Sequence, residues 1–326
     1  MITDFSFLDL PNIAFVLFVG MILALSIFGY IGNININSDG GNVNINGANV
    51  EMEVIKELTE KIDGDGASSL SITNPVGDVS IKPSEDSFII MKEVLKVPKS
   101  TSDDEKKQLL ESFSNDYIKK SSDNVDVLVP RMSVMGVMSV TVDLELMVPK
   151  HFSVKHNPGV NSISVEEMDG SVNLQNNVGN INLARLGGPV NVHTNSGTIN
   201  AMDLKEPRSL TVNAGNIIIS SFDLPDGDLN IVSQVGKVEL DIKSVASSAN
   251  CVVKSSTGSV LLVIDRSLNV SLDVSTSMGS IDVDPAIQSV QKGQSFMGGA
   301  ITATINHPGG KLSASSNTGS IVVKLK

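Results

Sequence analysis

The chain has 326 residues, enough to bury a substantial core in one large domain or two ordinary ones. Its 36 acidic and 24 basic residues give a net charge of −12, which argues against binding the phosphates of nucleic acid. Aromatic residues make up only 4 %, without tryptophan, so base-stacking grooves are disfavoured. One cysteine excludes an internal disulfide and any multi-cysteine metal site, and 41 % hydrophobic residues indicate a folded protein.

The N-terminal segment is strongly apolar over residues 13–31, and no charged residue lies between Asp9 and Asp39. A helix of this length, rising about 1.5 Å per residue, matches the ~30 Å hydrocarbon core of a bilayer. We predict that residues 1–32 form an uncleaved transmembrane anchor. The alternatives are a cleaved signal peptide, which normally begins with basic residues, and a buried core helix. The first basic residue after the run is Lys56, so the positive-inside rule is nearly silent on orientation.

From residue 33 onward one pattern recurs around glycine. Apolar residues stand seven and five places before the glycine, and two and four places after it. Apolar residues two apart share one face of a strand, and glycine suits the turn between two strands. The pattern is centred on Gly41, Gly77, Gly170, Gly179, Gly188, Gly197, Gly236, Gly258, Gly279 and Gly319, and its downstream half on Gly215 and Gly299.

The spacing of these glycines predicts a repeat architecture. From Gly170 to Gly197 they are nine residues apart, and a strand with its turn cannot bury its own apolar face at that length. Two such units make a coil of about 18 residues, and the later spacings run from 18 to 22. We therefore predict an all-β fold, a parallel β-solenoid over residues 33–326. An antiparallel meander or sandwich is the alternative.

The outward positions of the repeat are mostly Asn, Ser, Thr, Asp and Lys, as expected for a solvated face with stacked polar ladders. Ile218, Leu261 and Val322 depart from this rule. Apolar residues on both faces of a strand indicate burial on both sides. We expect another layer of the same chain to cover these three positions, with a partner as the alternative.

The repeat is interrupted by a predicted amphipathic helix within residues 100–121. Ser102 and Glu105 form a capping box at its start, and Lys119 and Lys120 are expected in its last turn. We expect this helix to cover the solenoid rather than to bind a membrane or a partner. Strands are predicted around it, at residues 87–97, 124–129 and 137–148.

Several segments resemble a known family. They are residues 142–159 (VDLELMVPKHFSVKHNPG), residues 70–81 (LSITNPVGDVSI), the repeat after Gly170, and the final Phe296-Met297-Gly298-Gly299 and Thr318–Ile321 segments. Together they are similar to the putative-adhesin β-solenoid family of bacteria and archaea, a domain of unknown function. The resemblance covers residues 60–326. It implies a parallel β-solenoid with an envelope-associated role, often with a membrane anchor, and no agreed active site.

The sequence shows no catalytic, cofactor or metal motif, and we predict none of these sites. His151 and His156 do not have the spacing of a helical zinc pair, and Cys251 occupies an inward apolar position, which indicates a buried structural thiol. Residues 63–66 and 226–228 resemble fragments of calcium loops but are expected to be turns. The carboxylates of Asp273, Asp282 and Asp284 could in principle hydrolyse a glycoside, although solvated surface charge is the better interpretation.

We therefore predict a single-pass membrane protein whose solenoid lies outside the cytoplasm. It is expected to be non-enzymatic, to act in adhesion, envelope contact or self-association, to have the membrane as a partner and possibly envelope polysaccharide, and not to bind nucleic acid. One alternative is a carbohydrate-active enzyme on a solenoid scaffold. Another is a cytoplasm-facing polymerising or stress-sensing accessory, suggested by an apparently uncapped C-terminal unit from Ser320 to Lys326.

Overall fold

The computed structural model describes residues 34–36, 43–45, 51–113, 117–131, 140–287, 291–294 and 297–326. The predicted anchor at residues 1–32 and the glycine at position 41 lie outside these residues, so both remain predictions. Among the described residues, no helix has the length and apolar character needed to span a bilayer.

The chain divides into two compact units. The first comprises residues 1–56, 95–113 and 132–141, and the second comprises residues 57–94, 114–131 and 142–326. Within the first unit, β1 (Ile34–Ile36) and β2 (Val43–Ile45) form an antiparallel pair. It also holds the only helix of the described residues, α2 (Asp103–Ser112).

Helix α2 begins with the predicted capping box. The backbone N–H of Ser102 donates to Glu105 Oε2 at 2.8 Å, and the Glu105 N–H donates back to Ser102 Oγ at 3.4 Å. These bonds hold the pKa of Glu105 below its ordinary value. The helix is shorter than predicted, because Phe113 is already extended. Lys119 and Lys120 therefore do not lie in its last turn; they belong to β7 (Ile118–Lys120), which pairs with β8 (Asn124–Leu128).

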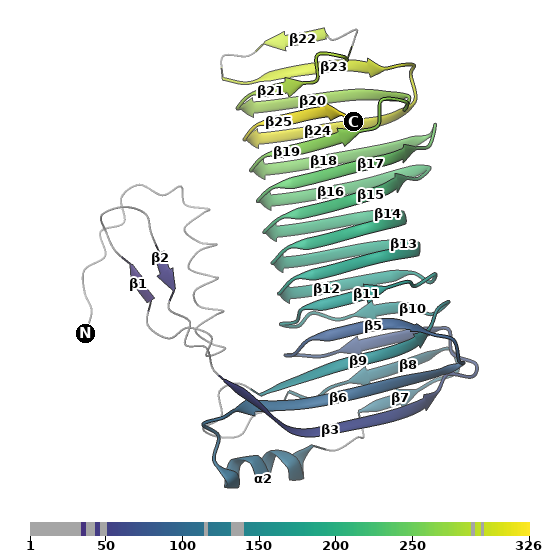
Figure 1. Ribbon diagram of the computed structural model, residues 1–326, viewed down its shortest axis with the longest axis vertical. Helices are drawn as coiled ribbons and strands as arrows, with labels where there is room; N and C mark the ends of the chain where they lie inside the picture. Colours follow the sequence, from purple (N-terminus) through teal and green to yellow (C-terminus); the bar gives the residue numbers. More distant parts are fainter. Residues whose placement is uncertain are drawn as a thin grey trace. The chain divides into compact units, whose positions relative to one another are not determined.

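The second unit is a stack of rungs, each made of one strand in sheet A and one in sheet B (Figure 1). Neighbouring strands within each sheet are parallel, with registers offset by 18 residues in the middle and by 21 and 22 further on. The predicted coil of 18 to 22 residues is thus confirmed. Antiparallel pairing is confined, among the described residues, to β1–β2, β7–β8 and the β20–β23–β22 segment.

Sheet A follows a spatial order that differs from chain order at both ends. Its strands, in register order, are β8, β4 (Ser69–Thr73), β10 (Ser153–His156), β12 (Val172–Val178), the second half of β13 (Ile181–Ser196), the second half of β14 (Ile199–Ala214), β16 (Gly227–Val235), β18 (Ala249–Thr257), β24 (Gly310–Thr318) and β20 (Val270–Met278).

Sheet B follows the same order on the other side of the core. Its strands are β9 (Thr141–Pro149), β5 (Val79–Ser84), β11 (Ile163–Glu166), the first halves of β13 and β14, β15 (Ile217–Leu224), β17 (Val238–Val245), β19 (Val260–Ile264), β25 (Ile321–Leu325) and β21 (Ile281–Val283). The remaining strands are β3 (Met52–Asp63), β6 (Phe88–Pro98), β22 (Gln291–Gln294) and β23 (Gly299–Ile305).

The predicted glycine turns form a column between the two sheets. The glycines at positions 77, 179, 197, 215, 236, 258, 279 and 319 all have positive φ. A Cβ on Gly215 would lie 1.9 Å from the carbonyl oxygen of Gly197, so each turn packs backbone against backbone. Gly170 and Gly188 are tightly packed too, but without positive φ, and Gly299 lies in strand β23 rather than in a turn.

A polar column inside the core accompanies the glycine column. Three residues before most of these glycines stands a buried Asn, Ser or Thr. Ser233 Oγ donates to the carbonyl of Gly215 at 3.1 Å, and Ser316 Oγ donates to that of Gly258 at 3.1 Å. These side chains satisfy turn carbonyls that the apolar interior would otherwise leave unpaired.

The two end rungs of the chain are inserted into the stack rather than placed on its ends. The N-terminal rung (β4 and β5) lies between the β8–β9 rung and the β10–β11 rung. The C-terminal rung (β24 and β25) lies between the β18–β19 rung and the β20–β21 rung. The segment from Ser320 to Lys326 is therefore not an uncapped end, and strands β23 and β22 follow β20 instead.

Candidate functional site

The outward side of sheet A carries a continuous array of neutral polar side chains. We call this array the amide grid, and it comprises Asn173, Gln175, Asn177, Asn191, His193, Asn195, Ser209, Thr211 and Asn213. These residues alternate with buried ones along β12, β13 and β14 because successive side chains point to opposite faces of a sheet. In a chain with a net charge of −12, no grid position carries a carboxylate.

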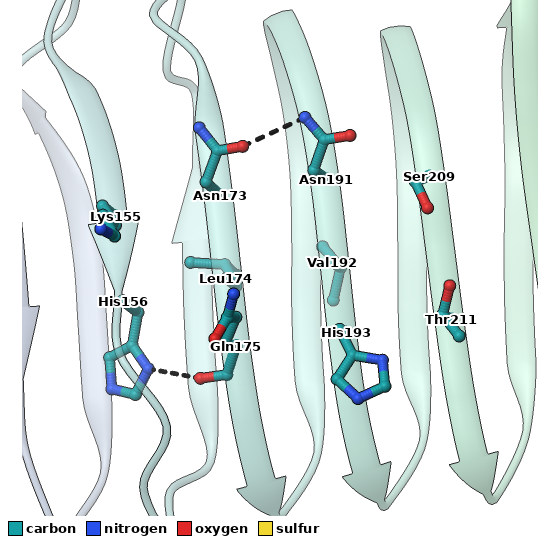
Figure 2. Close-up of a pocket in the computed structure, with 10 residues that line it drawn as sticks. All are labelled: Lys155, His156, Asn173, Leu174, Gln175, Asn191, Val192, His193, Ser209 and Thr211. Carbon is teal, nitrogen blue, oxygen red and sulfur yellow. Dashed lines mark hydrogen bonds between the residues drawn. The ribbon is translucent and has the colours of Figure 1, made fainter.

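Hydrogen bonds between rungs fix the amides of the grid. Asn191 Nδ2 donates to Asn173 Oδ1 at 3.1 Å (Figure 2). In the next column, Asn213 donates to Asn195 at 2.8 Å, and Asn195 donates to Asn177 at 3.2 Å. Each amide still has a further N–H and lone pair. The grid is therefore a preorganised set of donors and acceptors, which lowers the entropy cost of binding.

A shallow groove crosses the grid and is lined by both outward and inward residues (Figure 2). On its surface stand Lys155, Asn173, Gln175, Asn191, His193, Ser209 and Thr211. The groove runs over neighbouring strands, along the direction of stacking, so an extended ligand would contact several rungs.

The two histidines of the groove have different environments. His193 lies outward, whereas His156 is fully buried in register with Ile72 and Leu174. The Nδ1 atom of His156 lies 3.0 Å from the Gln175 carbonyl, which can only accept, so Nδ1 carries the proton. Burial lowers the pKa of His156, and this hydrogen bond opposes the shift only in part. His156 is thus a neutral core residue beneath the grid.

The outward side of sheet B is less uniform. Asn200 donates to Asn182 at 3.1 Å, the same ladder geometry as on sheet A. Ile218, Leu261 and Val322 are half-buried within the sheet. The strands that neighbour them are those of sheet B itself, and the described residues of the second unit contribute no further layer over them. The expected intrachain cover is therefore not seen in this part of the chain.

The carboxylates suggested for glycoside hydrolysis do not converge. Asp273 lies on β20 of sheet A and pairs with Lys311 at 3.2 Å, whereas Asp282 lies on β21 of sheet B. Asp284 accepts backbone N–H bonds from Ala286 and Leu325, and these bonds lower its pKa. Carboxylates on opposite sheets cannot act on one glycosidic bond.

The remaining sequence candidates are structural. Asp63 accepts the N–H of Asp65 in a turn at 3.0 Å, and Asp228 accepts a bond from Asn250 at 2.8 Å, so both calcium-like fragments are engaged in turns and ladders. Cys251 is fully buried, and burial raises its pKa to about 12, as expected for a structural thiol. No group of three or more His, Cys, Asp or Glu in the described residues could hold a metal ion.

Sequence reasoning identified outward polar positions but not the grid. The missed signal is the eighteen-residue spacing of Asn173, Asn191 and Ser209, and of Asn177, Asn195 and Asn213. This spacing places one residue per rung on the same sheet, whereas the nine-residue repeat alternates between the sheets.

The fold and this surface define a parallel β-solenoid with a rigid polar face. The chain belongs to the Toastrack family, DUF4097, whose model matches residues 67–324. The family resemblance predicted from the sequence is confirmed. No curated protein shows significant similarity to the chain.

Solved structures with detectable similarity come from several bacteria. A putative adhesin from Bacteroides fragilis NCTC 9343 is 11 % identical, with 83 % of this chain and 98 % of that one covered and a TM-score of 0.42. A putative adhesin from Parabacteroides merdae ATCC 43184 is 15 % identical, with 83 % and 97 % covered and a TM-score of 0.38. A putative lipid binding protein from Parabacteroides distasonis ATCC 8503 is 12 % identical, with 82 % and 96 % covered and a TM-score of 0.33.

Proposed function

We propose that this chain is a non-enzymatic binding protein of the cell envelope, held to the membrane by its N-terminal segment. In this proposal the solenoid faces the outside of the cell, and the amide grid contacts a neutral, hydroxyl-rich envelope polymer. The observation that carries the proposal is the grid itself, a preorganised array of amides and hydroxyls without carboxylates in an acidic chain.

The physical argument concerns the match between the grid and a polysaccharide. Hydroxyl groups both donate and accept hydrogen bonds, as do the free positions of the grid amides. Rungs about 4.8 Å apart repeat the same contacts along the stack, so a polymer gains from many weak bonds at once. The scarcity of aromatic residues implies weak binding per sugar and makes a long contact necessary.

The test compares two matched variants of the full chain. Asn191→Glu changes the grid on sheet A, and Asn200→Glu changes the ladder on sheet B, where the same 3.1 Å amide bond is lost. Both are measured in detergent for co-sedimentation with polysaccharide extracted from the envelope of the source cells. We expect at least about tenfold weaker binding for Asn191→Glu only, which corresponds to about 1.4 kcal/mol. Equal binding by both variants and the unchanged chain would contradict the proposal.

The location of the solenoid needs a separate measurement. Protease added to intact cells should digest residues 33–326, with lysed cells as the control. Protection that disappears on lysis would place the solenoid inside the cell. That result would favour the polymerising or stress-sensing alternative.

A further inference from the structure

The C-terminal rung occupies a slot with two open sides in the stack. Strand β24 pairs along its length with β18 on one side and β20 on the other, and β25 pairs with β19 and β21. Without this rung, both neighbours would present unpaired parallel edges that can accept a strand. The slot therefore offers a donor twice the backbone pairing that a rung at the end of a stack would find.

The slot is shaped for this particular sequence. Leu312, Ala314 and Ile321 are buried between the neighbouring rungs. The Gly319 N–H donates to the Met278 carbonyl at 2.9 Å, and a Cβ at this glycine would lie 2.0 Å from the Gly258 carbonyl oxygen. A donor strand must therefore bring a glycine at the turn and the hydroxyl of Ser316 three residues earlier. A second copy of the chain meets this requirement.

The connection into the slot is short and locally strained. Residues 306–309 join β23 to β24, and Asn306 adopts a left-handed conformation with φ of 55°. Short hinges under strain favour the exchange of an element between copies. The chain ends at Lys326, so no further segment has to pass through the slot when the rung leaves or enters it.

We propose that the C-terminal rung is exchanged between copies of this chain, so that residues 310–326 of one copy fill the slot of another. Within the slot the contacts are the same in both cases, so the balance depends on the hinge and on protein concentration. The proposed membrane anchor would raise the local concentration of copies and favour exchange. This inference does not depend on the polysaccharide-binding function.

The test uses single-cysteine variants of the full chain. Lys254 and Ser315 are register partners on adjacent strands of sheet A, and both side chains point outward. Adjacent strands lie about 4.8 Å apart, within the range that a disulfide can bridge. A Lys254→Cys chain and a Ser315→Cys chain are mixed in denaturant with reductant, refolded together in detergent at several concentrations, and then oxidised. The native Cys251 is buried, with its pKa raised to about 12, and stays silent.

We expect a disulfide-linked dimer whose yield increases with protein concentration. The pair His193→Cys and Ser315→Cys is the matched control, because these positions are not register partners and should remain monomeric. The double variant Lys254→Cys/Ser315→Cys should form the bond within one chain, which verifies the register. An intrachain bond in the double variant without any dimer from the mixed chains would overturn the exchange. Failure of the intrachain bond would overturn the slot itself.

Discussion

His156 shows how one buried residue couples the fold to pH. It occupies an inward position between Ile72 and Leu174, where most rungs carry an aliphatic side chain. Its neutral ring has one proton donor, which is paired with the Gln175 carbonyl. Burial holds its pKa below 6.5, the ordinary value.

We expect the protein to lose stability as pH falls below about 6.5. The unfolded chain then binds a proton at His156 that the folded chain does not, so the free energy of unfolding decreases by about 1.4 kcal/mol per pH unit until the pKa of the folded state is reached. Denaturant unfolding between pH 7.5 and 5.5 measures this slope. His156→Leu should remove it, while His193→Leu, an outward change, should not. An unchanged slope in His156→Leu would show that another group is responsible.

Single residues at the opposite turns carry a different strain. Glu167, Arg185, Asp203 and Ser221 all adopt left-handed conformations with φ between 52° and 56°. They stand eighteen residues apart, so the same turn recurs in successive rungs. Arg185 Nε donates to Glu167 Oε1 at 2.8 Å across two of these turns, an exposed pair that contributes little to stability. The repeat thus imposes the conformation even where no glycine is present.

At the scale of elements, the glycine column sets how closely the rungs can stack. Each turn glycine places its backbone against the carbonyl of the preceding turn, and a side chain would force the two turns apart. A rung displaced in this way would lose its ladder bonds in both sheets. The column is therefore a structural requirement rather than a preference.

Gly215→Ala should destabilise the protein by about 3 kcal/mol or more, because φ is 143° and the new Cβ would lie 1.9 Å from the Gly197 oxygen. Thermal and denaturant unfolding of the full chain measure the loss. Gly299→Ala is the matched control, since its Cβ would meet its nearest atom at an ordinary 3.5 Å. Similar stabilities for the two variants would show that the rungs can separate without cost.

At the scale of the whole molecule, the sequence predicts the rungs but not their order. Alternating apolar residues around Gly197 and Gly215 identify strands and turns, because inward positions must be apolar and close turns need glycine. Every rung carries the same pattern, however, so nothing local distinguishes a neighbour 18 residues away from one 61 residues away, as Asn250 and Lys311 are. The amide grid escaped sequence reasoning for the same reason, since sheet assignment requires the coil.

The middle of the stack should tolerate the loss of one complete rung. Deleting residues 182–199 joins Ile181 to Asn200, and Ile181 is the register partner of Ile199. We expect a folded protein that is less stable by about 1–3 kcal/mol, with cooperative unfolding by circular dichroism. Deleting residues 182–190 is the control, because half a rung would send each later strand to the wrong sheet. Cooperative unfolding of that control would contradict the rung assignment.

The inserted end rungs bear on how such a protein can change length in evolution. Both ends are clasped, so a duplicated unit added at either terminus would meet no free edge in register. Between residues 172 and 264, chain order and stacking order agree, and a duplication there simply adds a step of about 4.8 Å. Homologous chains should therefore grow or shrink from the centre while their ends stay constant. The reach of such a protein from the membrane can then be adjusted without redesigning either end.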